Sequence, residues 1–175
     1  MQMMIIGIDN GLDGGVSYLD PNGNVGLDVM PTVGGEGGGK RSYDIQSMVR
    51  ILNKIRTLAS GFGWGIHCYL EHAQAFPGQG VSSMFSVGLG FGLWQGILSA
   101  LFVPYTLVRP QAWQKVMFEG LDRSDTKKCS ALVVSRLYPG TDFRASDKCR
   151  KAHEGLTDAT CIAAYGKKHY STINP

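Results

Sequence analysis

The stretch Met3-Met4-Ile5-Ile6-Gly7-Ile8-Asp9-Asn10-Gly11 decides the fold class and supplies the first candidate functional residue. Its apolar run has the length of a buried strand, and Asp9 follows that run directly. Residues 14–19 and 24–30 predict two further strands, with Asp20-Pro21-Asn22-Gly23 as the turn between them. We therefore expect three consecutive antiparallel strands at the start of the chain.

Helices and strands alternate in the remainder. A Gly-rich loop is expected over residues 31–41, followed by a helix that Asp44 caps. Residues 64–70 predict a fourth strand that ends at Glu71, and residues 82–100 predict a long helix. A fifth strand is expected over residues 104–108.

Three shorter helices complete the expected order. Pro110 suits the first turn of one, Ser124 is a candidate cap for the next, and residues 156–165 predict the last. The whole chain, residues 1–175, is thus expected to form a single α/β domain in which helices flank a mixed five-stranded sheet.

The distribution of charge says more than the net charge, which is only +3. From Arg123 to Lys168, ten Lys and Arg stand against five Asp and Glu, which gives +5 there and −2 elsewhere. A basic C-terminal third is typical of a surface that binds a polyanion, with an affinity that falls steeply with salt. An ordinary solvated surface explains the same charges equally well.

The cysteines and the N-terminus favour a cytoplasmic protein. The four cysteines, at positions 68, 129, 149 and 161, lack the Cys-x-x-Cys spacing of a zinc site and show no disulfide framework. Reduced thiols are therefore expected. No basic region precedes the first apolar run, which argues against a signal peptide.

A membrane-spanning helix is an alternative for one stretch. Residues 81–103 comprise 23 residues without a charge, which is long enough to cross a bilayer. Serine and glutamine interrupt the stretch, and no Lys or Arg lies close beside it, so we favour a buried helix and expect no membrane partner.

Four carboxylates are the candidates for chemistry. Asp9 and Glu71 each end an apolar strand, so both can lie at one edge of the sheet. Glu154 and Asp158 are four residues apart where the last helix begins, and therefore share a helix face. Taken singly, each is explained as a turn former or a solvated acid. Taken together, without a His/Cys cluster, they favour Mg²⁺ or Mn²⁺, which promote phosphodiester hydrolysis, often as a pair of ions.

The sequence resembles the RuvC-type Holliday-junction resolvases of the RNase H-like superfamily, and most of all the branch found in bacteriophages and plant chloroplasts. The segments that carry the resemblance are residues 5–11 (IIGIDNG), 70–71 with 76–85 (LE and FPGQGVSSMF), 108–115 (VRPQAWQK) and 153–159 (HEGLTDA). They follow the family order and cover nearly the whole chain. The first motif alone also occurs in actin-like kinases, but 175 residues cannot readily supply two such lobes.

The resemblance implies an RNase H-like fold and the cleavage of four-way DNA junctions by a homodimer. Symmetric nicks with 5′-phosphate and 3′-hydroxyl ends are expected, at a site holding two Mg²⁺ or Mn²⁺ ions. Asp9, Glu71, Glu154 and Asp158 occupy the four acidic positions of the family. The third is more usually Asp, so Glu154 is a departure. In another arrangement of the family the last two acids are three apart, and the corresponding position is Gly155; His153 is a possible auxiliary residue.

The remaining candidates are surface residues. Gly88, Gly92 and Gly96 form one stripe along the long helix, either as a dimer contact or as a packing surface for the chain's own sheet. Phe76 and Gln79 follow Glu71, where an aromatic ring could stack on an opened base or simply plug the protein. The basic candidates for phosphate contacts are Lys40, Arg41, Lys115, Lys127, Lys128, Arg144, Lys148, Arg150 and Lys151, each of which an exposed solvated cation explains equally well.

Two functional alternatives stay open. Another RNase H-like nuclease, acting on RNA or on branched DNA other than four-way junctions, would use the same acids. A nonenzymatic junction-binding dimer would bind tightly without nicking DNA, although acids at all four positions argue against it. A cytoplasmic location, in a bacterium or a phage-infected host, is expected for either.

Overall fold

The computed structural model of the protein describes residues 1–34, 40–74, 78 and 80–173. Its main sheet has the order β3-β2-β1-β6-β7. The strands are β1 (Met3–Asp9), β2 (Gly15–Leu19), β3 (Val25–Val29), β6 (Gly65–Glu71) and β7 (Tyr105–Val108). The first three are antiparallel, whereas β6 runs parallel to both β1 and β7. The predicted mixed five-stranded sheet and its three antiparallel strands are confirmed.

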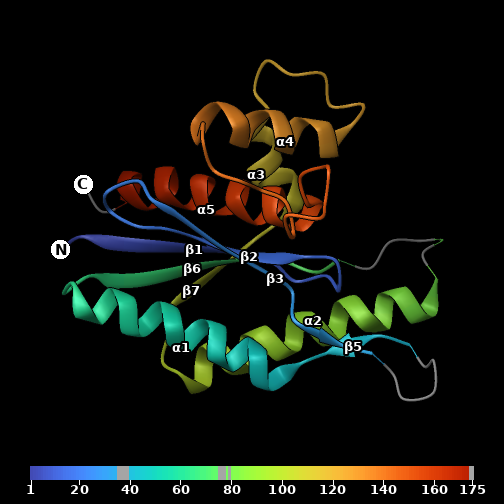
Figure 1. The fold of residues 1–175 in the computed structure, drawn as a ribbon, viewed down its shortest axis with the longest axis horizontal. Helices are drawn as coiled ribbons and strands as arrows, with labels where there is room; N and C mark the ends of the chain where they lie inside the picture. Colours follow the sequence, from blue (N-terminus) through green and yellow to red (C-terminus); the bar gives the residue numbers. More distant parts are fainter. Residues whose placement is uncertain (35–39, 75–77, 79, 174–175) are drawn as a thin grey trace.

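Helices cover both faces of this sheet (Figure 1). On one face lie α1 (Ile45–Gly61) and α2 (Val81–Ala100); on the other lie α3 (Pro110–Met117), α4 (Thr126–Leu137) and α5 (Glu154–Ile173). Each face has its own hydrophobic core. Strand β1 serves both, because Ile6 and Ile8 point into the core under α1 and α2 while Ile5 points into the other, as the period of a strand requires.

The helix caps agree with the sequence in one case and differ in another. Asp44 caps α1, since its carboxylate accepts a hydrogen bond from the Ser47 amide at 3.1 Å. The expected cap of α4 was wrong by one residue: Asp125, not Ser124, caps that helix. Ser124 instead donates its amide and hydroxyl hydrogens to Asp122, so its hydroxyl serves the preceding turn.

Two further boundaries were wrong. The loop expected over residues 31–41 contains strand β4 (Thr32–Val33), which pairs with β5 (Ser42–Tyr43) in a separate two-stranded sheet. The last helix, expected over residues 156–165, spans Glu154–Ile173. Gly166 does not end α5 because its missing side chain makes room for the ring of Tyr69, which a Cβ atom there would overlap.

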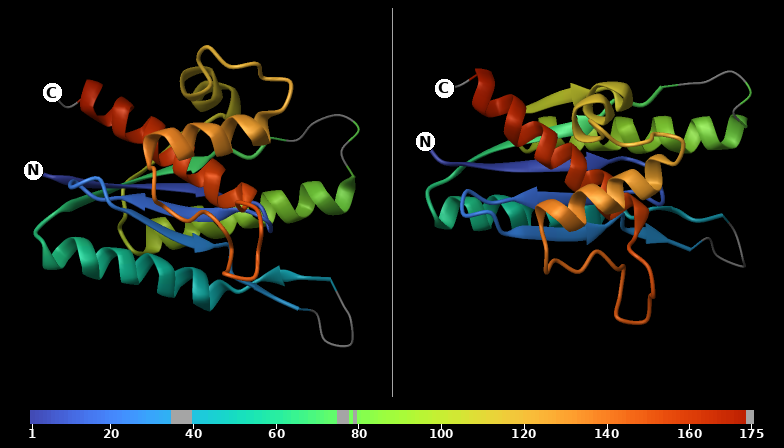
Figure 2. Two further views of the ribbon diagram at one scale, coloured as in Figure 1. Left: turned by 45° about the horizontal axis from the view of Figure 1, so that its top comes forward. Right: turned by 90° about the horizontal axis from the view of Figure 1, so that it is seen from above.

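Small residues bring α5 very close to β1 (Figure 2). A Cβ atom on Gly7 would overlap the backbone of Ala159 and Ala163. The contact is reinforced on β2, where the Thr160 hydroxyl donates to the Ser17 hydroxyl at 2.9 Å. This packing fixes the start of α5 over the end of β1, and with it the position of Asp158.

Candidate active site

Asp9 and Glu71 lie side by side where two parallel strands end. Strands β1 and β6 pair Ile8 with Leu70, so the next residue of each strand is one of the two acids. This edge, at the right of Figure 1, is also where α5 begins. Three elements therefore bring acidic side chains to one end of the sheet, as the sequence predicted for Asp9 and Glu71.

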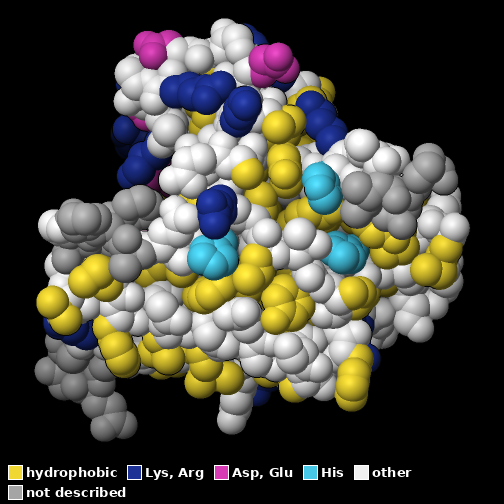
Figure 3. All heavy atoms as spheres, turned by 180° about the vertical axis from the view of Figure 1, so that it is seen from behind, with side chains coloured by type: hydrophobic (Ala, Val, Ile, Leu, Met, Phe, Trp, Pro, Cys, Tyr) yellow, Lys and Arg dark blue, Asp and Glu magenta, His cyan; other side chains and the backbone are white. Residues whose placement is uncertain are grey.

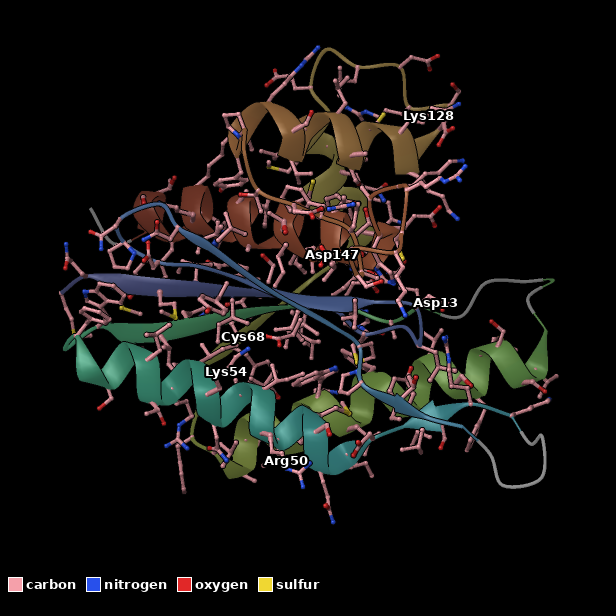
Figure 4. The ribbon with its side chains drawn as sticks, in the orientation of Figure 1. Asp13, Arg50, Lys54, Cys68, Lys128 and Asp147 are labelled. Atoms are coloured by element: carbon pink, nitrogen blue, oxygen red, sulfur yellow. The ribbon has the colours of Figure 1, made fainter. Side chains whose placement is uncertain are left out.

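A cleft of about 450 Å³ opens at this edge. Asp9, Glu154 and Asp158 line it, and so does Asp13, which the sequence analysis did not single out. Figure 4 shows Asp13 at the end of the sheet, in the loop after β1. The first two turns of α2 form the opposite wall, with Ser82, Ser83, Ser86 and Val87. The cleft thus carries acidic groups and is open to a substrate.

Glu71 is held by hydrogen bonds at both its backbone and its carboxylate. The buried Asn10 amide donates to the Glu71 carbonyl oxygen at 2.5 Å. The indole N–H of Trp113 donates to Glu71 Oε1 at 2.8 Å. Glu71 does not line the cleft that contains the other three acids. The Glu71 side chain is consequently held beside the cleft, where it interacts electrostatically with Asp9.

Burial and the charges of neighbouring acids raise the pKa of two of these carboxyl groups, that of Asp9 to neutrality and that of Glu71 above it. The pKa of Asp9 rises to about 7 because of burial and, next, the charge of Asp158; a hydrogen bond from the Gly11 amide opposes this rise. The pKa of Glu71 rises to about 8, first through burial and then through Asp9, while the bond from Trp113 opposes the rise. A bound divalent cation would favour the ionised form of both groups, so their protons would pass to the solvent when the ion binds.

Asp158 and Glu154 differ, although they share a helix face. Burial raises the pKa of Asp158 to about 6, and the charge of Glu154 adds to this rise. Glu154 is more than half exposed, and its carboxylate forms an ion pair with Lys127 on α4 at 2.5 Å. Glu154, which departs from the Asp that the resemblance implies at this position, thus lines the cleft while its carboxylate is paired with a lysine.

An acid in place of Gly155, as in the other arrangement that the resemblance offers, would force the loop after β1 to move. Its Cβ atom would overlap the backbone of Asp13 and Gly14, because α5 begins directly against that loop. His153, the auxiliary candidate, lines a neighbouring cavity of about 490 Å³ together with Arg150, Lys151 and Glu154. Its ring Nδ1 is buried and has no hydrogen-bond partner within the described ranges.

The donor set fits a hard divalent cation in its chemistry. Among the described residues, no three Asp, Glu, His or Cys side chains are already arranged to enclose an ion. The charge of Asp158 nevertheless raises the pKa of both Asp9 and Glu71, and the charge of Asp9 raises the pKa of Glu71, so these carboxyl groups interact electrostatically. Carboxylate oxygens are the ligands that Mg²⁺ and Mn²⁺ prefer, and a bound cation would relieve the repulsion between them.

The predicted basic residues lie on four parts of the chain: the β4–β5 hairpin, α3, α4 and the loop before α5. Figure 3 shows Lys and Arg side chains gathered over the part of the molecule where α3 and α4 lie. Several are paired: Arg41 with Asp13 at 2.5 Å, Lys128 with Asp125, and Arg144 with Asp142. The exposed candidates on this side and in the hairpin also include Lys40, Lys115, Lys148, Arg150 and Lys151. Phe76 and Gln79 lie outside the described residues.

The glycine stripe on α2 faces outward. A Cβ atom on Gly88, Gly92 or Gly96 would meet no atom within 4 Å, so the stripe does not pack against the chain's own sheet. Together with Leu89 and Leu93 it lines an apolar groove of about 670 Å³. By length and composition α2 is also the one helix, among the described residues, that could cross a membrane. Trp94, Ile97 and Leu98 on its other side are buried in the core.

Sequence reasoning missed three residues that shape the site. Asn10 and Trp113 were quoted only as parts of motifs, yet both hold Glu71. Asp13 looked like an ordinary turn residue. Only the adjacency of Asn10 to Asp9 could have drawn attention to any of them, because the contact between Trp113 and Glu71 depends on how β6 and α3 are arranged in space.

Solved structures share the arrangement described above, although no family model and no curated protein matches the sequence. Thermus thermophilus RuvC in complex with Holliday junction substrate is 15% identical, with a TM-score of 0.58, 97% of this chain covered and 96% of that one. A second Thermus thermophilus RuvC structure is 18% identical, with a TM-score of 0.54 and the same coverage. The yeast mitochondrial Holliday junction resolvase Ydc2 is 14% identical, with a TM-score of 0.51 over 97% of this chain and 82% of that one. The chain therefore has the RNase H-like fold of the RuvC-type resolvases.

Proposed function

We propose that the protein is a metal-dependent nuclease that resolves four-way DNA junctions as a homodimer. One observation carries this proposal: on the RNase H-like fold, Asp9 and Glu71 end adjacent parallel strands and Asp158 lies over them at the start of α5. The similarity to structures of Holliday-junction resolvases supports the choice of substrate. A cytoplasmic location, in a bacterium or a phage-infected host, fits a substrate of DNA and belongs to the same proposal.

The chain's own residues would bind and orient the reacting groups. Asp9, Glu71 and Asp158 would hold two Mg²⁺ or Mn²⁺ ions, and Glu154 would join them after release from Lys127. When bound, such ions activate a water and neutralise charge on the attacked phosphate. The basic residues around the cleft would fix the phosphate backbone so that attack occurs in line and leaves 5′-phosphate and 3′-hydroxyl ends.

The outward-facing groove on α2 supports the dimer. Its glycines leave an apolar surface on which the same helix of a second copy can lie closely, as small residues permit. Gly92→Glu would place a charge in the groove, whereas Ser99→Glu changes an exposed residue of the same helix outside its lining. Sedimentation should show a dimer for the wild type and Ser99→Glu and a monomer for Gly92→Glu; a monomeric wild type would refute the dimer.

A substrate panel separates this function from the alternatives. The protein would be incubated with a four-way junction, a flap, a linear duplex and an RNA–DNA hybrid, each with Mg²⁺ or with EDTA. We expect Mg²⁺-dependent nicking of the junction alone, abolished by Asp9→Asn and retained by Glu119→Gln, which changes an exposed acid outside the cleft lining. Cleavage mainly of the flap or hybrid would favour another RNase H-like nuclease. Tight junction binding without nicking would identify a nonenzymatic binding protein.

A further inference from the structure

Trp113 differs from the two other tryptophans in what its indole N–H contacts. It donates to the Glu71 carboxylate at 2.8 Å. Trp64 donates to the amide oxygen of Gln2, a neutral acceptor at the surface. The Trp94 indole N–H is buried and has no hydrogen-bond partner in the described part of the chain. Of the three tryptophans, Trp113 is therefore the one whose buried indole N–H donates to a candidate metal ligand.

The fold leaves the Trp113 ring little freedom. Strand β7 pairs Val108 with Glu71, and α3 begins two residues later at Pro110, which carries Trp113 to the Glu71 side chain. The indole is 2% exposed and packs edge-on against the buried Phe118 ring, with centroids 5.3 Å apart. Close packing of this kind holds a side chain in one rotamer. The hydrogen-bond donor is thus placed before any ligand arrives.

The bond also distinguishes the two carboxylate oxygens of Glu71, because only one of them accepts a hydrogen bond from a described residue. Trp113 occupies Oε1, and within the described residues the Glu71 carboxylate accepts no other hydrogen bond. The Glu71 backbone is fixed independently, because Asn10 donates to its carbonyl oxygen. Groups that bond to metal ligands in this way orient them and tune their affinity.

We propose that Trp113 is a positioning residue that holds Glu71 through Oε1 and presents Oε2 to a divalent cation. This inference rests on the proposed metal-dependent function. It predicts that the indole N–H raises metal affinity although it touches neither metal nor DNA. Removing the N–H while keeping an aromatic ring, as in Trp113→Phe, should weaken metal binding by roughly 10-fold or more.

Mn²⁺ binding to the DNA-free protein tests the proposal without relying on activity. Calorimetric titration would compare the wild type with Trp113→Phe and with Trp94→Phe, a matched control that removes an equally buried indole lacking this bond. We expect weaker binding only for Trp113→Phe. In a Glu71→Gln background, the same substitution should have no further effect, because the tryptophan acts through the carboxylate.

An NMR measurement keeps the inference testable should Trp113→Phe fail to fold. In ¹H–¹⁵N spectra of Glu71→Gln, the indole proton of Trp113 should move upfield because its acceptor loses its charge, while the Trp64 and Trp94 signals stay in place. Unchanged or tighter Mn²⁺ binding by Trp113→Phe, or an unmoved Trp113 signal, would overturn the positioning role alone. A wild type that neither binds Mn²⁺ nor nicks junctions would instead refute the proposed function.

Discussion

Asp9→Asn should stabilise the metal-free protein while it abolishes nicking. The substitution keeps the shape of the side chain and an oxygen that can accept the bond from the Gly11 amide. It removes a negative charge from a site where burial and Asp158 raise the pKa of the native carboxyl group to about 7. Asp9 would thus destabilise the folded protein when no cation is bound.

The size of the effect follows from the pKa of Asp9. A rise from 3.8 to about 7 corresponds to at most roughly 4 kcal/mol for keeping Asp9 ionised in the folded protein. The side chain is only partly buried, and its repulsion is shared with neighbouring acids. We therefore expect Asp9→Asn to raise the free energy of unfolding by about 1–3 kcal/mol at pH 8 in EDTA.

The effect must depend on pH with a defined sign. Because the folded-state pKa of Asp9 lies above its unfolded value, the stability associated with its protonated form is present below about pH 4 and is lost as the pH rises through about 7. The difference between variant and wild type should consequently be small at pH 4 and largest at pH 8. Saturating Mg²⁺ should reverse the order at pH 8, since only the wild type binds it well.

Urea denaturation followed by circular dichroism measures this difference, at one protein concentration and at pH 4 and 8. Asp13→Asn is the matched control, because Asp13 is 87% exposed and lies on the same edge of the sheet. It should change the stability little at either pH. An Asp9→Asn protein that is less stable than the wild type at pH 8 in EDTA, or a difference that does not change with pH, would refute the reasoning.

Two other substitutions test the packing and the charges around the cleft. Gly155→Ala should lower the free energy of unfolding by about 2 kcal/mol or more, because its Cβ atom overlaps the backbone of the loop after β1. Gly61→Ala, in open space at the end of α1, should cost nothing in a thermal melt, and equal melting temperatures for the two would contradict the packing. Lys127→Gln should weaken junction binding and reduce the slope of log affinity against log salt by about 1. Lys54→Gln is its control, since Figure 4 shows Lys54 on α1, across the sheet from Lys128 on α4; identical slopes for both variants would remove Lys127 from the DNA surface.

The strand ends were predictable because their signal is local. An apolar run that stops at an acid fixes both the strand and the place of the acid, as at Asp9 and Glu71. The end of α5 was not predictable, because Gly166 followed by two lysines has the composition of a helix end. Only the ring of Tyr69, almost one hundred positions away in the chain, explains why a glycine belongs inside that helix.

The sequence predicted which residues belong to the candidate site better than it predicted how they are arranged in space. The sequence places Glu154 and Asp158 on one helix face, but not the lysine of α4 that pairs with Glu154. It likewise contains Trp113 without indicating its bond to Glu71. Both contacts join elements distant in sequence, so they depend on the packing of helices over the sheet and not on local pattern.

The most direct test of the central claim is a map of nicks on all four strands of a synthetic mobile junction, made with and without Mg²⁺. A metal-dependent resolvase predicts nicks at symmetric positions in two opposing strands, with 5′-phosphate ends that a ligase can seal, and none in EDTA. Asymmetric nicks, absent nicks, or nicks that persist without the metal would contradict the claim that Asp9, Glu71 and Asp158 form a metal centre for junction resolution.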